Sequence, residues 1–190
     1  AAQTVTKRVV IIGTGYDTSF TDEGVVARLT STLTLKVDKV IVKSVQLGSV
    51  YIYSSECIID RCYATYIGVS SSTAGMNHIY SCYISGCIVG YSSPYSQMDI
   101  QNCVIINNGL SQNVCNLTSS IINNNVIYKS YTTNSSYYCL HSITDSQITN
   151  NMIYGYSSYN SNYYNLAINS SVYASGSGNT IERNIISDNV

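Results

Sequence analysis

One motif recurs along the chain and restricts the folds open to it. It runs Ile, two residues, Asn or Cys, one residue, then Ile or Ala. Copies begin at Ile59, Ile79, Ile100, Ile122, Ile148 and Ile181, which are 20, 21, 22, 26 and 33 residues apart, and Val42–Leu47 is a degenerate seventh copy. A period just above 20 residues with β-branched apolar positions indicates a solenoid of strands. Leucine-rich and helical repeats do not fit, because leucines are few and helical repeats are longer.

We therefore predict an all-β fold, a single-stranded parallel β-helix with about 20–22 residues per coil and longer insertions between the C-terminal coils. In a strand, residues two positions apart face the same side, but Ile122 and Asn125 are three positions apart and both are expected to face inward. The chain must therefore bend between them. Asn is the non-glycine residue that best tolerates the left-handed conformation of a tight bend. Stacked coils would place these Asn side chains in a hydrogen-bonded ladder with a spacing of about 4.8 Å.

The same ladder position is filled by Cys in the early coils and by Asn in the later ones. Its predicted members are Cys62, Cys82, Cys103, Asn125, Asn151 and Asn184. We predict that these cysteines are free buried thiols, although adjacent coils would also permit a disulfide. The seven cysteines point to different coils, so we predict no metal site and no cofactor.

The chain has few charged residues, and this low charge restricts the kinds of ligand that it is expected to bind. Only 10% of the 190 residues are charged and the net charge is −1, whereas 19 are Tyr. A nucleic-acid-binding surface would need a basic patch, so no nucleic acid is expected. No apolar run is long enough for a membrane-spanning helix. The long neutral surface of hydroxyls and amides suits an extracellular protein that meets polar, uncharged ligands such as sugars.

The repeated Ile-x-x-Asn-x-Ile coils, together with VTKRVVIIGTGY at Val5–Tyr16 and VDKVIVKSVQL at Val37–Leu47, resemble the right-handed parallel β-helix, pectin-lyase-like superfamily. The N-terminal segments are similar to the first coils of secreted β-helix proteins of unknown function from Bacteroides-type gut bacteria. The resemblance implies a secreted or cell-surface protein. It implies one domain over 1–190, with first coils in 1–48 and repeat coils in 49–190. Such a domain can also be part of a longer surface protein. It specifies the fold better than the function, because the superfamily includes lyases, hydrolases, epimerases and adhesins.

An enzyme of this kind would need clustered carboxylates, and the later coils contain only Asp99 and Asp145 between Cys62 and Ile181. The compact acid–base group is Glu56, Asp60 and Arg61, which we interpret as solvated ion pairs and keep as the fallback catalytic set. His78 and His141 have no acid or nucleophile that the spacing places beside them.

Two outward features favour binding. The Tyr/Ser/Asn-rich loops at 131–142 and 154–179 resemble adaptable binding surfaces. Their predicted recognition residues are Tyr128, Tyr154, Tyr156, Tyr159, Asn160 and Asn162. Two adjacent, outward, partly apolar stripes are predicted either to contact a protein partner or a second copy, or to be covered by loops of the same chain. The first comprises Tyr63, Tyr83, Val104, Val126, Met152 and Ile185, and the second Thr65, Ser85, Ile106, Tyr128, Tyr154 and Ser187.

Three functions remain open from the sequence. The leading one is non-catalytic binding of a polysaccharide or surface glycan. The second is a polysaccharide lyase or glycoside hydrolase of the pectin-lyase-like type. The third is a structural or adhesive segment of a larger surface protein.

Overall fold

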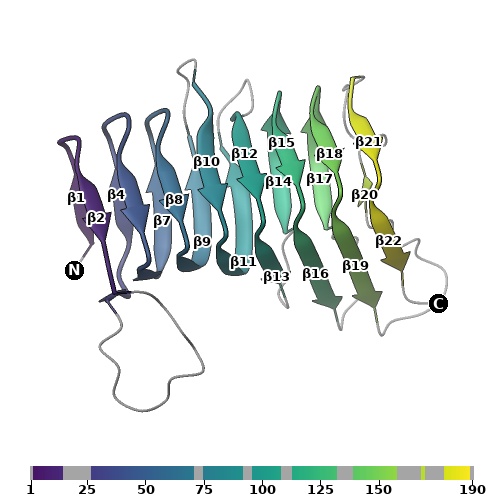
Figure 1. Cartoon of the computed structure of the whole chain (residues 1–190), viewed down its shortest axis with the longest axis horizontal. Coiled ribbons are helices and arrows are strands. Elements are labelled where there is room, and N and C mark those ends of the chain that lie inside the picture. Colours follow the sequence, from purple (N-terminus) through teal and green to yellow (C-terminus); the bar gives the residue numbers. More distant parts are fainter. Residues whose placement is uncertain are drawn as a thin grey trace, which may run out of the picture.

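A computed structural model places the strands in long parallel sheets that run from one end of the molecule to the other (Figure 1). The structure describes residues 2–14, 27–70, 75–91, 96–107, 113–131, 139–157, 168–169 and 178–188. Within these residues every element is a β-strand, and every strand pairing is parallel. The predicted all-β class with long parallel sheets is confirmed, and the sheets form an open, solenoid-like arrangement.

The first sheet contains eight of the described strands, one from each successive coil. Its order is β2 (Val10–Ile12), β5 (Ile41–Lys43), β8 (Ile58–Asp60), β10 (Asn77–Tyr80), β12 (Met98–Gln101), β15 (Ile121–Asn123), β18 (Gln147–Thr149) and β21 (Thr180–Glu182). Each copy of the repeat motif begins in this sheet, because its first Ile pairs in register with the Ile of the next coil, as Ile100 does with Ile122.

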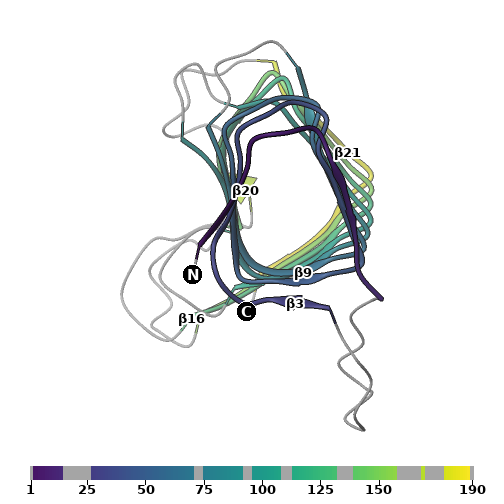
Figure 2. The same cartoon turned by 90° about the vertical axis from the view of Figure 1, so that its left-hand side faces the viewer.

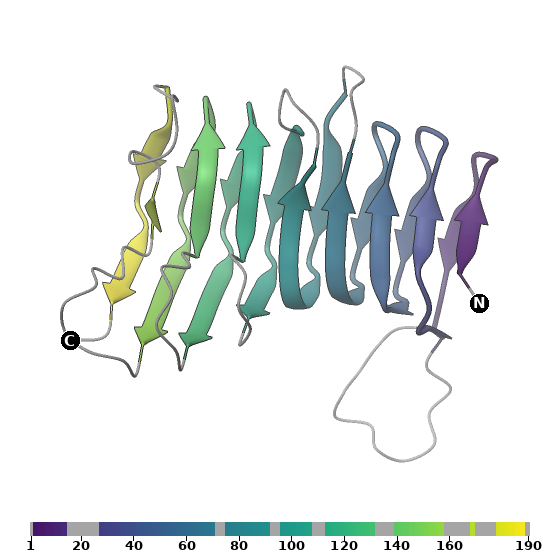
Figure 3. The ribbon, with the colours of Figure 1, turned by 180° about the vertical axis from the view of Figure 1, so that it is seen from behind.

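The second sheet contains fourteen described strands. Its main path is β1 (Gln3–Val5), β4 (Leu33–Leu35), β7 (Ser49–Ile52), β9 (Tyr63–Val69), β11 (Tyr83–Gly90), β13 (Val104–Asn107), β16 (Val126–Tyr131), β19 (Met152–Ser157) and β22 (Ile185–Asp188). Its branches are β3 (Arg28–Leu29), β6 (Gln46–Leu47), β14 (Val114–Thr118), β17 (Leu140–Thr144) and β20 (Ile168–Asn169). Seen along the stack, successive coils superimpose (Figure 2), and the same strand order is visible from behind (Figure 3).

The core lies between the sheets and consists of stacked apolar rows. One row comes from the first Ile of each repeat, and another from the last position, which includes Ile84, Ile105, Ile127 and Ile153. The side chains of both rows are fully buried through Ile148 and Ile153, whereas Ile181 in the last repeat is 41% exposed. Burial of each Ile contributes about 1.5–3 kcal/mol, so the repeat that defines the sequence also supplies the main apolar stabilisation.

The ladder residues lie at the corner between the two sheets, which we call the first corner. Asn125 N–H donates to Asn151 Oδ1 at 2.9 Å, and Asn151 N–H donates to Asn184 Oδ1 at 2.8 Å. Each side-chain amide also donates to a carbonyl of the preceding coil, as Asn125 Nδ2 does to Ile100 O at 2.9 Å. These bonds satisfy backbone groups that the bend removes from the sheets.

Cysteine occupies the same bonding positions in the early coils. The N–H groups of Cys62 and Cys82 each lie 3.4 Å from the Sγ atom of the next coil, and Cys103 N–H donates to Asn125 Oδ1 at 2.8 Å. All seven cysteines are free and buried. The pKa of the Cys82 thiol is raised well above its ordinary value by hydrogen bonds with Cys103 and Cys62 and by burial.

The bend lies between Ile122 and Asn125, as predicted, but the left-handed residue is not the ladder Asn. It is the residue before it, and Asn124 has φ 55°. The same position has positive φ in the other coils, at Ser44, Arg61, Ser81, Asn102, Asn150 and Arg183. The ladder side chain must stay inside to bond its neighbours, so the turn is made by a residue whose side chain is free to face outward.

A second ladder lies at the other end of the first sheet and was not predicted. It is built by the residue two positions before the first Ile of each repeat. Met98 N–H donates to Ser120 Oγ, Ser120 N–H to Ser146 Oγ and Ser146 N–H to Asn179 Oδ1, each at 2.9 Å. The recurrence of Ser or Asn at this offset was visible in the sequence.

Candidate functional site

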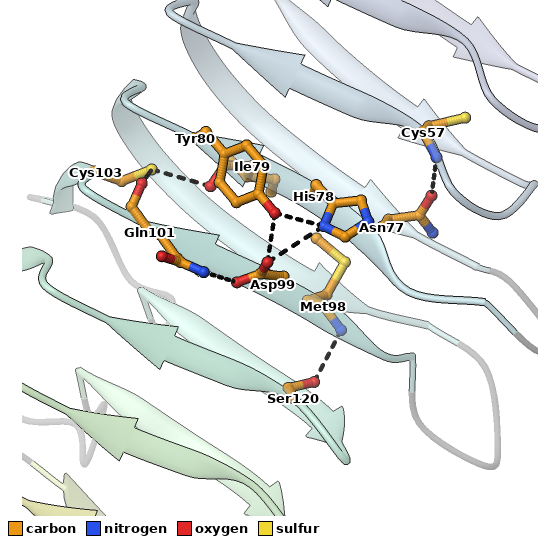
Figure 4. Close-up of polar contacts among 10 residues, drawn as sticks. All are labelled: Cys57, Asn77, His78, Ile79, Tyr80, Met98, Asp99, Gln101, Cys103 and Ser120. Carbon is orange, nitrogen blue, oxygen red and sulfur yellow. Dashed lines mark hydrogen bonds and ion pairs between the residues drawn. The ribbon is translucent and has the colours of Figure 1, made fainter.

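The outward face of the first sheet carries a cluster of polar side chains on β10 and β12. On β10, Ile79 is buried in the core, whereas His78 and Tyr80 on either side of it are partly exposed. The strands pair so that His78 is opposite Asp99, and Tyr80 is opposite Gln101. Four hydrogen-bonding side chains are therefore held together by parallel strand pairing (Figure 4).

Asp99 is the centre of this cluster. Tyr80 Oη donates to Asp99 Oδ2 at 2.5 Å, and Gln101 Nε2 donates to Asp99 Oδ1 at 2.7 Å. His78 Nδ1 lies 2.7 Å from Tyr80 Oη and 3.3 Å from Asp99 Oδ2. Asp99 is only 6% exposed. A carboxylate this deeply buried requires such donors, and here both of its oxygens have one.

The hydrogen-bond inventory selects one tautomer of His78. The single proton of Tyr80 is donated to Asp99, so His78 Nδ1 must donate toward the Tyr80 and Asp99 oxygens. In the neutral form of the imidazole, the lone pair then lies on Nε2, on a side chain that is 28% exposed. Burial, followed by the hydrogen bond to Asp99, raises the pKa of Tyr80, which keeps the phenol protonated. An Asp-oriented imidazole of this kind can accept a proton from a bound molecule.

This cluster corrects the expectation that no acid is placed beside His78. The two residues are 21 positions apart, which equals the spacing of the repeats that begin at Ile79 and Ile100. Counting one repeat forward from His78 would have found Asp99. His141, by contrast, has Ser142 Oγ at 3.0 Å from its Nδ1, and burial lowers its pKa.

The predicted fallback group Glu56, Asp60 and Arg61 is divided. Asp60 forms ion pairs with Lys43 at 3.3 Å and with Arg61 at 3.4 Å. Glu56 precedes β8, whereas Asp60 ends it, and Glu56 pairs with Lys39 at 3.3 Å. Glu56 lies in the bend before the strand, with φ 56°, and the two carboxylates therefore form ion pairs with different lysines.

Two pairs of tyrosine rings stack across neighbouring strands of the second sheet. Tyr63 and Tyr83 have ring centroids 5.5 Å apart and an interplanar angle of 9°. Tyr128 and Tyr154 have centroids 5.3 Å apart and an angle of 10°. The structure thus brings together two of the predicted recognition residues. The side chain of Tyr156 and the residues Tyr159, Asn160 and Asn162 lie outside the described part.

The first predicted apolar stripe follows the strand register, from Tyr83 through Val104, Val126 and Met152 to Ile185. Exposure rises along it, from 42% at Val126 to 49% at Met152 and 64% at Ile185. The stripe is therefore an outward surface of the second sheet, most apolar toward the C-terminal coils.

A groove lies on the same sheet over the N-terminal coils, with a volume of about 470 Å³. Its lining comes from three coils and comprises Ala2, Thr30, Ser31, Thr32, Gln46, Leu47, Gly48, Ser49, Tyr63 and Thr65. None of these residues carries a charged side chain, so the groove offers hydroxyls, one amide and one aromatic ring. The sequence did not predict it, because most of its lining residues, such as Thr30, Thr32 and Ser49, lie outside the repeated motif.

Among the described residues, no three His, Cys, Asp or Glu side chains are grouped as metal ligands would be. The described part also contains no helix with the length and hydrophobicity needed to cross a membrane. Comparison of the chain with family models, with curated proteins and with solved structures finds no match. The candidate functions therefore depend on the local chemistry of the surfaces described above.

Proposed function

We propose that this chain is a secreted or cell-surface, right-handed, single-stranded parallel β-helix similar to the pectin-lyase-like superfamily, and that it binds a glycan without cleaving it. The unbranched order of the first sheet supports the β-helix, because each coil adds one strand beside the last. Only 10% of the residues are charged, which favours a neutral, hydroxyl-rich ligand.

The observation that carries the binding function is the stack of Tyr128 on Tyr154. The two rings are nearly parallel on strands β16 and β19, which pair in register. Their stacking fixes both side chains, so little rotamer entropy is lost when a ligand binds. Tyr also combines an apolar ring with a hydroxyl, a combination that suits the mixed apolar and polar surface of a sugar.

The experiment incubates the purified protein with a panel of polysaccharides and records retention and polymer chain length together. We expect retention without shortening, and we expect Tyr154→Ala to weaken it. Tyr53→Ala is the matched control, because Tyr53 is exposed and stacks with Tyr51 instead of with Tyr128 or Tyr154. Equal retention by the Tyr154 and Tyr53 variants would contradict a role for the stack. Absence of retention with every polymer would favour the structural or adhesive function.

A second candidate is a polysaccharide lyase or glycoside hydrolase, and the cluster around His78 favours it. Asp99 and Tyr80 orient the imidazole so that Nε2 is the proton acceptor. This function predicts that the polymer shortens on incubation. His78→Gln and Asp99→Asn should then abolish shortening and leave retention unchanged, whereas Glu56→Gln should alter neither.

A further inference from the structure

The groove over the N-terminal coils has the dimensions and chemistry of a small-ligand site. Pockets for small molecules typically measure about 300–1,000 Å³, and this groove measures about 470 Å³. Its hydroxyls come from Thr30, Thr32, Ser49 and Thr65, and its amide comes from Gln46. These groups both donate and accept hydrogen bonds, as a polyhydroxylated ligand requires.

Tyr63 is the aromatic wall of the groove, and its ring is held from two sides. Tyr83 stacks on it with a centroid separation of 5.5 Å. Its Oη donates to Ser85 Oγ at 2.8 Å. Gln46 pairs in register with Tyr63 from the preceding coil, which places the amide next to the aromatic residue. A pre-positioned ring beside a planar amide loses little side-chain entropy on binding.

Gly48 forms part of the groove where two backbone segments approach closely. Its N–H donates to Leu29 O at 2.8 Å. A Cβ at this position would lie only 2.5 Å from Thr30 O. A larger residue would therefore push the segment of Thr30 and Thr32 away from Tyr63. The lining of the groove depends on the absence of a side chain at Gly48.

We propose that this groove binds one uncharged sugar residue of a glycan, with Tyr63 as the aromatic contact and Gln46, Thr30, Thr32, Ser49 and Thr65 as its polar contacts. The proposal rests on the proposed glycan-binding function and names a subsite for it. The lining supplies no cation to neutralise a carboxylate, so an acidic sugar would lose hydration without compensation. The site therefore selects neutral sugars over uronates.

Tyr63 and the Tyr128–Tyr154 stack lie on the same sheet, so one polymer can contact both. Tyr63 and Val126, which is two residues before Tyr128, are linked through the register Tyr63, Tyr83, Val104 and Val126. Three strand spacings of about 4.8 Å give a separation of about 14 Å along the sheet. The groove would then hold one part of a glycan chain that extends toward the C-terminal coils.

The test is chemical-shift mapping by NMR on the isotope-labelled chain, with neutral oligosaccharides of glucose, galactose, mannose and N-acetylglucosamine. An oligogalacturonate of equal length is the acidic comparison. We expect a neutral oligosaccharide to shift the backbone amide of Gly48 and the side-chain amide of Gln46. The oligogalacturonate should bind at least tenfold more weakly.

Three variants locate the contact. Tyr63→Ala should weaken binding about tenfold, whereas Tyr63→Phe, which keeps the ring, should stay within about threefold of the wild type. Tyr53→Ala should leave binding unchanged. A native-like spectrum for Tyr63→Phe ensures that the ring can be tested even if Tyr63→Ala unfolds the first coils.

The outcomes separate this proposal from the broader one. If an oligosaccharide binds but its shifts fall only around Tyr128 and Tyr154, the groove proposal is overturned and glycan binding stands. Preference for the oligogalacturonate would also overturn it. If no glycan, oligomeric or polymeric, binds the wild-type chain, the proposed function and the groove proposal fall together.

Discussion

The two halves of the first-corner ladder perform the same structural task with different chemistry. In the N-terminal half, the sulfur atoms of Cys62 and Cys82 accept or donate hydrogen bonds with donor–acceptor distances of 3.1–3.6 Å. In the C-terminal half, Asn125 and Asn151 use amide atoms at 2.8–3.0 Å. Thiols are weak hydrogen-bonding partners but pack as small apolar groups. The comparison teaches that this corner needs one acceptor and one donor per coil, and that either side chain can supply them.

The largest expected change in the free energy of unfolding comes from a substitution in the Asn half of the ladder. Asn151→Ala removes the acceptor of Asn125 N–H and the donor to Ile122 O. Two buried backbone groups lose their partners, at about 1–3 kcal/mol each. We expect the free energy of unfolding, measured by urea denaturation, to fall by about 3 kcal/mol. The control is Asn150→Gly on the exposed side of the bend, because Gly tolerates the positive φ of this position. Equal losses from the two variants would contradict the ladder's role.

The corresponding change in the thiol half should cost less. Cys82→Ala removes a sulfur that accepts from Cys62 N–H at 3.4 Å and donates to Ile59 O at 3.5 Å. Because both bonds are long and weak, we expect a loss of about 1 kcal/mol in the same denaturation experiment. A loss as large as that of Asn151→Ala would show that the two chemistries are equally strong.

An exchange between the halves sharpens the comparison further. Cys103→Asn places an amide where the sulfur accepts from Cys82 N–H and donates to Ile79 O. If the positions are equivalent, stability should change by less than about 1 kcal/mol. Cys103→Asp is the matched control, since it keeps the acceptor but has no donor when ionised. That variant should be strongly destabilised at neutral pH and partly recover as the pH falls toward the carboxyl pKa.

The smallest expected effect concerns a thiol outside the ladder. Burial, followed by the charge of Cys87, raises the pKa of Cys115 to about 12 from an ordinary value of 9.0. The unfolded chain then releases this proton first, so stability is complete below pH 9 and is lost as the pH rises toward 12. At pH 9 the stability already lost is about 0.4 kcal/mol. The pH dependence of unfolding should become shallower in Cys115→Ala, and an unchanged slope would contradict the assignment.

Much of the architecture follows from the repeat alone. The inward Ile rows, the bend between Ile122 and Asn125 and the register of Cys82 with Cys103 are consequences of spacing, because neighbouring coils can bury their apolar faces in only one register. The second ladder was equally accessible, since Ser120 and Ser146 share one offset from the repeat. It was missed because Ser is common in loops and gives no apolar signal.

The candidate sites differ in how far the sequence alone predicts them. His78 and Asp99 are joined by one repeat length, so the sequence contained the signal but not the hydrogen-bond geometry that selects a tautomer. Glu56 and Asp60 are close in sequence, but Glu56 lies before β8 and pairs with Lys39, whereas Asp60 ends β8 and pairs with Lys43. Proximity along the chain therefore did not predict a shared ion-pair group.

The sequence by itself determined the coil, because a strand-forming repeat of about 20 residues must stack its apolar rows to bury them. Only the tertiary structure decided which outward side chains meet. Strand pairing stacked the ring of Tyr128 on that of Tyr154 and brought the Tyr80 hydroxyl into a hydrogen bond with Asp99. Close backbone packing at Gly48 holds the Thr30–Thr32 segment in the lining of the groove beside Tyr63. Those outcomes depend on side-chain direction and loop path, which a repeat pattern leaves unspecified.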